Sequence, residues 1–139
     1  MREEVLNFKF KVSLGWIVLM ILITIQSSLS GFKLPPLGLR LEDKLVHFLI
    51  FGILAWLIIR GMSKETSAWI QKRKIIISLI IAILFAISDE WHQSLTLKRD
   101  ADLFDLLADT LGIISFVLLF LRKQKQGAFN WDSTLSENP

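Results

Sequence analysis

A stretch of acidic residues between two apolar segments constrains this chain more than any other feature. The stretch covers residues 88–112, and the segments on both sides are rich in Ile, Leu and Phe. Its carboxylates are Asp89, Glu90, Asp100, Asp102, Asp105 and Asp109. A charge beside long apolar segments is costly unless it has a partner or a function. We therefore expect these side chains to form one polar site.

The composition is that of a small membrane protein. Of 139 residues, 53% are hydrophobic, and the mean hydropathy of +0.52 is too high for a soluble domain of this length. The chain has no cysteine, which excludes disulfides, thiolate metal sites and cysteine nucleophiles. The basic residues stand beside apolar segments, a pattern typical of membrane orientation, so we expect no nucleic-acid partner.

Apolar segments predict an all-α membrane protein, a bundle of four transmembrane helices. The predicted helices are residues 12–29, 44–60, 75–91 and 102–121. Asp43 and Asp102 are predicted N-caps of the second and fourth helices. Two interpretations fit the first segment: a retained span, or a cleavable signal peptide with Ser28, Leu29 and Ser30 at its cleavage site. Residues 1–121 form the predicted domain, and residues 122–139 form a polar tail.

The distribution of basic residues predicts the orientation of the bundle. Most of the 16 Lys and Arg residues lie in the N-terminal head, in the polar connection at residues 61–74 and just after the fourth segment. Because cytoplasmic loops are enriched in Lys and Arg, both termini are predicted in the cytoplasm. The acidic stretch then faces outward.

Three predicted elements meet at the outward face: the start of the second helix, the end of the third and the connection into the fourth. The candidate catalytic residues are His47, Glu90 and Asp105, and the candidate ligand-binding residues are Asp43, Lys44, Asp89, Gln93, Arg99, Asp102 and Asp109. Paired carboxylates can perform acid–base chemistry, and carboxylates with histidine can hold a divalent cation. Arg99 can bind a phosphate or a carboxylate.

Structural roles compete with these functional ones. His92 is interpreted as a solvated residue at the membrane interface. His47 fits a catalytic role, and equally a role satisfied by Asp43 one turn earlier or by a carboxylate of the third helix. Asp105 and Asp109 lie one and two turns inside an apolar helix, which favours a functional or inter-helix pairing role over simple solvation.

Two motifs and a series of single residues resemble the VanZ-like family of small bacterial membrane proteins. The motifs are Asp43-Lys44-Leu45-Val46-His47-Phe48 and Ser88-Asp89-Glu90-Trp91-His92-Gln93, and Arg99, Asp102, Asp105, Asp109 and Gly112 follow them. The resemblance covers residues 14–121. It marks Asp43, Lys44, His47, Glu90, Gln93, Arg99, Asp105 and Gly112 as family-signature positions. The chain departs from the family pattern at Asp109, where asparagine is usual.

The resemblance implies a multi-pass protein of the bacterial cytoplasmic (inner) membrane, in a family associated with teicoplanin resistance. Our leading hypothesis is that the outward-facing site binds or modifies an amphiphilic component of the cell envelope. A lipid-linked precursor or a lipoglycopeptide such as teicoplanin fits this description, and membrane lipids are the other expected partners. Two alternatives remain open: a hydrolase or transferase that uses carboxylates with a divalent cation, and a structural protein that recruits partners. The residues do not decide whether the chain is an enzyme.

Overall fold

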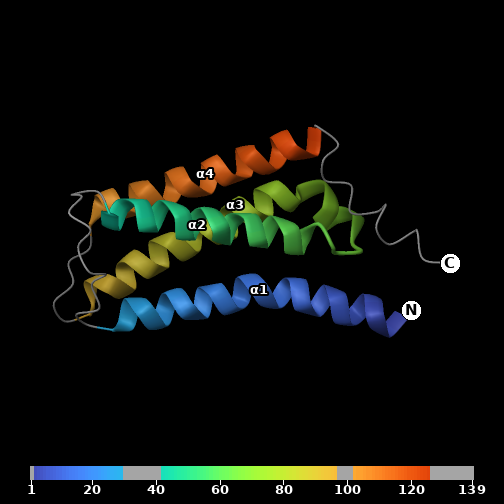
Figure 1. Ribbon diagram of the computed structural model, residues 1–139, viewed down its shortest axis with the longest axis horizontal. Helices are drawn as coiled ribbons and strands as arrows, with labels where there is room; N and C mark the ends of the chain where they lie inside the picture. The colour runs from blue at the N-terminus through green and yellow to red at the C-terminus, as the bar shows by residue number, and fades with distance from the viewer. Residues whose placement is uncertain (1, 30–41, 97–101, 126–139) are drawn as a thin grey trace.

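The computed structural model describes residues 2–29, 42–96 and 102–125, and within these ranges every regular element is a helix (Figure 1). The helices are α1 (Arg2–Ser28), α2 (Glu42–Met62), α3 (Ala68–Ser94) and α4 (Leu103–Lys125). Consecutive helices run in opposite directions, so α2 and α4 run the same way. The predicted all-α class is confirmed.

The helices are longer than predicted at several ends. α1 begins at Arg2, and α4 continues to Lys125, into the segment predicted to be a polar tail. α3 begins at Ala68, so much of the predicted connection is helical. Lys and Arg are good helix formers, and their charge is favourable near a helix C-terminus such as that of α4. A drop in hydropathy therefore does not mark a helix end.

The predicted N-cap role is wrong for Asp43 and confirmed for Asp102. α2 begins at Glu42, which places Asp43 inside the first turn, where the helix dipole still favours an acid. Asp102 directly precedes α4, and its Oδ1 accepts a hydrogen bond of 2.9 Å from the backbone N–H of Phe104. The two aspartates thus act differently at similar sequence positions.

α2 lies at the centre of the bundle and contacts each of the other helices. Leu54, Ile58 and Ile59 of α2 are completely buried, and they pack in one core with Ala82 and Ala86 of α3. The outer surface is also apolar, with Ile76 and Leu84 each 61% exposed. Because lipid tails are as apolar as these side chains, close packing between the helices becomes the main stabilising contribution in a membrane.

The closest helix–helix approach joins α2 and α4, which share the most extensive contact. A Cβ atom placed on Gly112 of α4 would lie 2.8 Å from the carbonyl carbon of Phe48 in α2. A second glycine, Gly52 of α2, lies against the ring of Phe116, because a Cβ there would lie 2.7 Å from Phe116 Cε2. Small residues let neighbouring helix backbones come this close.

Among the helices that the structure describes, α2 and α4 are long and apolar enough to cross a membrane, judged by length and composition. In α1 the apolar part is the shorter stretch Leu14–Ser28. Helix length and composition therefore support two of the four predicted spans.

Candidate functional site

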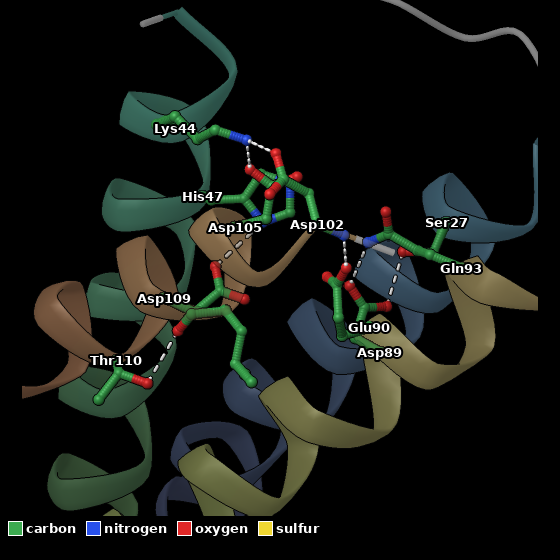
Figure 2. A network of polar contacts seen from close by, with 11 residues as sticks. Ser27, Lys44, His47, Asp89, Glu90, Gln93, Asp102, Asp105, Asp109 and Thr110 are labelled. Atoms are coloured by element: carbon green, nitrogen blue, oxygen red, sulfur yellow. Dashed lines mark hydrogen bonds and ion pairs between the residues drawn. The ribbon is translucent and has the colours of Figure 1, made fainter. Parts of the chain in front are cut away.

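Most of the predicted site residues gather at one end of the bundle, where α2 and α4 begin and α3 ends (Figure 2). We call this group the polar cluster; it consists of Lys44, His47, Asp89, Glu90, Gln93, Asp102, Asp105 and Asp109. All of these residues except Lys44, His47 and Asp102 are buried. Arg99 was also predicted to bind a ligand, but it lies outside the described residues.

Lys44 connects α2 to the start of α4. Its Nζ donates hydrogen bonds to Asp102 Oδ2 and to Asp105 Oδ1, forming two ion pairs. The hydrogen bond from Lys44 holds the pKa of Asp102 below its ordinary value, and the N–H of Phe104 adds to this effect. Asp102 and Asp105 are therefore partly neutralised by the lysine of the Asp-Lys-x-x-His-Phe motif.

His47 contacts Asp109 at the same α2–α4 interface. The Nδ1 atom of His47 lies 3.0 Å from Asp109 Oδ1, and Asp109 is 1% exposed. Because an ionised carboxylate only accepts hydrogen bonds, Nδ1 is the donor to Asp109 Oδ1. The predicted partners, Asp43 and a carboxylate of α3, were wrong: α4 comes closest to this face of α2, since Gly112 carries no side chain.

Glu90 connects the end of α3 to the start of α4. Its Oε1 accepts a hydrogen bond from the backbone N–H of Asp102. Within residues 2–29, 42–96 and 102–125, its second oxygen, Oε2, has no hydrogen-bond partner, and the same is true of Asp109 Oδ2. Both carboxylates are more than nine-tenths buried, so two desolvated acceptors are left to be satisfied.

Asp89 belongs to a separate set of contacts between α1 and α3. Its Oδ1 accepts a hydrogen bond of 2.6 Å from Ser27, and its Oδ2 accepts one of 2.8 Å from Gln93. His92 has a partner nearby, because Ser28 Oγ lies 2.9 Å from its Nε2. This contact is exposed, so the interpretation of His92 as a solvated residue at the membrane interface stays a prediction.

Ser27 is completely buried and is not among the site residues predicted from the sequence. The sequence does contain a signal for a polar contact here, because the apolar first segment ends with Gln26, Ser27 and Ser28. Polar residues at the end of such a segment predict a membrane interface or a cleavage site. Only the packing of α1 against α3 shows that Ser27 is the donor to a buried carboxylate.

One group of side chains has the composition of a cation site. Potential ligand atoms of Asp43, His47 and Asp105 all lie within 4.8 Å of one another. The three side chains fit a cation site in part, because metal-binding histidines commonly donate their other ring N–H to a carboxylate, as His47 Nδ1 does to Asp109. Lys44 opposes the fit, because its ammonium group already pairs with Asp105.

The geometry supports two kinds of chemistry. The Asp109–His47 pair resembles the arrangement in which a carboxylate fixes a histidine tautomer and leaves Nε2 as a general base. The surplus of carboxylates over cations in the polar cluster favours ligand groups that donate hydrogen bonds, such as hydroxyls and amines.

The family model described as VanZ/LLP1 matches residues 8–124. That range contains both sequence motifs and every residue of the polar cluster. No curated protein and no solved structure matches the chain.

Proposed function

Because the chain belongs to the VanZ/LLP1 family, and is thereby linked to the membrane and to the cell envelope or antibiotic resistance, we propose that its polar cluster binds or modifies an amphiphilic envelope component. The proposed ligand class is a lipid-linked precursor or a lipoglycopeptide such as teicoplanin. The protein is a multi-pass protein of the bacterial cytoplasmic membrane in this proposal, with four spans and the cluster facing outward.

One observation carries the proposal: two buried carboxylate oxygens in the cluster, Glu90 Oε2 and Asp109 Oδ2, have no donor among the described residues. A buried acceptor left unsatisfied costs about 1–3 kcal/mol. Hydroxyl or amine groups of a ligand head group can supply the missing hydrogen bonds. The ionised pair of Lys44 and Asp105 lies in the same cluster and can accept and donate further bonds.

An amphiphile also fits the surroundings of the cluster. Leu103 and Phe104, in the first turn of α4, are 78% and 68% exposed. They lie directly after Asp102 in the chain, so a large apolar surface adjoins the polar one. A ligand with a polar head and an acyl chain can use both surfaces at once, whereas a fully polar ligand leaves the apolar one unused.

The orientation is supported by the arrangement of the helices. The start of α1 and the end of α4 lie at one end of the bundle, opposite the polar cluster (Figure 1). Single cysteines at Ser94 and Ser67, both exposed, test it with a membrane-impermeant reagent on intact cells. We expect labelling of Ser94→Cys alone. Labelling of Ser67→Cys alone contradicts the proposed topology.

Ligand binding is tested in lipid nanodiscs with a fluorescent lipoglycopeptide and with its deacylated form. We expect Glu90→Gln, Arg99→Ala and Asp105→Asn to raise the Kd about tenfold or more, the range for losing a charge-assisted hydrogen bond. The matched control is Glu65→Gln, which removes a carboxylate at the opposite end of the bundle. The deacylated ligand should bind wild type more weakly.

An unchanged Kd in all three variants contradicts the binding proposal. If the variants also lose thermal stability, the result favours the structural alternative, in which the charges only pair the helices.

The arrangement of Asp43, His47 and Asp105 supports one further candidate, a hydrolase or transferase that uses a divalent cation. In that case His47 and the two aspartates would hold the cation, which would supply activation of water or polarisation of a substrate oxygen. The test measures metal content by mass spectrometry after purification, beside His47→Ala. This candidate is supported if the wild-type protein contains metal and His47→Ala does not. It is rejected if the wild-type protein is free of metal and its hydrolase or transferase turnover is insensitive to a chelator.

A further inference from the structure

A groove runs along the α2–α4 pair from its middle toward the end opposite the polar cluster. This surface groove of about 300 Å³ is lined by Ile53 and Trp56 of α2 and by Phe116, Leu119 and Lys123 of α4. Trp56 is nine residues beyond His47, which corresponds to about 13 Å along a helix. The groove therefore shares no residue with the polar cluster.

The absence of a side chain on Gly52 shapes this groove. The ring of Phe116 occupies the space where a Cβ of residue 52 would lie, 2.7 Å from Phe116 Cε2. The ring is therefore held against the α2 backbone as part of the groove wall. Ile53 and Leu119 remain 44% and 45% exposed, so the groove opens to the outer surface of two helices that are apolar enough to span a membrane.

The rim of the groove is basic. Lys123 Nζ lies 5.3 Å from the centroid of the Trp56 ring, a contact that places the ammonium group beside the apolar walls. The last turn of α4 also carries Arg122, and α2 ends with Arg60 in its last turn. An apolar groove that ends at a basic helix terminus is complementary to a lipid with an acyl chain and an anionic head group.

We propose that this groove binds an anionic phospholipid, with one acyl chain between Trp56 and Leu119 and the phosphate at Lys123. Charge complementarity favours this occupant over a second copy of the chain. In a membrane, a copy with the same orientation brings its own basic helix ends to the same level, where like charges repel. A zwitterionic lipid lacks the net charge that the basic rim selects.

Phospholipids with brominated acyl chains test the proposal, because bromine quenches a tryptophan that it touches. The protein is delipidated in detergent and titrated with brominated phosphatidylglycerol or with phosphatidylcholine carrying the same chains. The difference between wild type and Trp56→Phe isolates the signal of Trp56. We expect phosphatidylglycerol to quench Trp56 at lower concentration than phosphatidylcholine.

Variants separate a site from general surface charge. Lys123→Gln should weaken phosphatidylglycerol binding about fivefold, the usual effect of one basic residue at a membrane surface. It should weaken phosphatidylcholine binding less, because choline offsets the charge of that lipid's phosphate. Lys125→Gln is the matched control, because it removes the same charge from the same helix turn outside the groove. Leu119→Trp fills the groove and should reduce the quenching by both lipids.

Three results overturn the proposal. They are equal quenching by the two lipids in wild type, equal losses in Lys123→Gln and Lys125→Gln, and a wild-type dimer in detergent that Leu119→Trp converts to a monomer. The last result assigns the groove to a second copy of the chain.

Discussion

Gly112→Ala tests whether backbone contact between α2 and α4 builds the polar cluster. The added Cβ would lie 2.8 Å from the carbonyl carbon of Phe48 and closer still to its oxygen. Ordinary carbon–carbon contacts are about 3.5–4.0 Å, so the two helices must separate by roughly 1 Å. His47 directly precedes Phe48, and Asp109 lies one turn from Gly112. The same separation therefore stretches their 3.0 Å contact beyond hydrogen-bond range.

The two contributions to stability have opposite signs. Alanine favours a helix over glycine by about 1 kcal/mol, and overpacking costs about 1–3 kcal/mol. A backbone carbonyl cannot move aside as a side chain can, so we take the upper part of that range and expect a net loss of about 1–2 kcal/mol. For a chain of this size, the melting temperature should fall by about 2–8 °C.

The assay is unfolding in detergent micelles with increasing SDS, followed by helical circular dichroism. Gly15→Ala is the matched control, because the space around Gly15 is open to at least 4 Å and its substitution should leave stability unchanged or slightly higher. A Gly112→Ala protein as stable as Gly15→Ala would refute the close approach. It would also remove the explanation for the pairing of His47 with Asp109.

Three further predictions concern single contacts of the polar cluster. Asp109→Asn keeps an acceptor for its histidine partner and should change stability by less than about 1 kcal/mol, whereas Asp109→Leu should lose about 1–3 kcal/mol in SDS unfolding. Ser27→Ala removes the α1 donor to Asp89 and should lower the free energy of unfolding by about 1.5–3 kcal/mol. Ser28→Ala is the control and should lower it less, because its contact with His92 is exposed. The lowered pKa of Asp102 means that its ion pair with Lys44 stabilises the fold at pH values above the ordinary pKa of an aspartate and that this contribution is lost as the pH falls through the lowered value. Acid unfolding of Asp102→Asn should lack that dependence, and an unchanged acid transition would contradict the ion pair.

The helical class and the place of the polar cluster were both predictable from hydropathy and charge. Long apolar segments predict helices, because in lipid the backbone must satisfy its own hydrogen bonds. Polar residues at the ends of those segments predict where charges gather. The motifs that resemble a VanZ-like protein lie within the range that matches the family.

The pairing of the individual side chains was not predictable. A carboxylate one turn inside a helix can face any neighbour, and the choice depends on which helices touch and how closely. His47 faces α4 because Gly112 has no side chain and lets the α2 backbone come close. Asp89 faces α1 because Ser27 lies opposite it. Neither fact has a signal within the local sequence of the charged residue.

Sequence alone thus determined what kind of chain this is: apolar, helical, with its acidic residues concentrated at one end of the bundle. These properties follow from each segment's own solvent preference and need no knowledge of its neighbours. Tertiary structure decided which acids are neutralised and which are left unsatisfied, since that depends on distances of a few ångströms between separate helices. Lys44 neutralises Asp102 and Asp105, whereas one oxygen each of Glu90 and Asp109 stays without a donor in the described part of the chain.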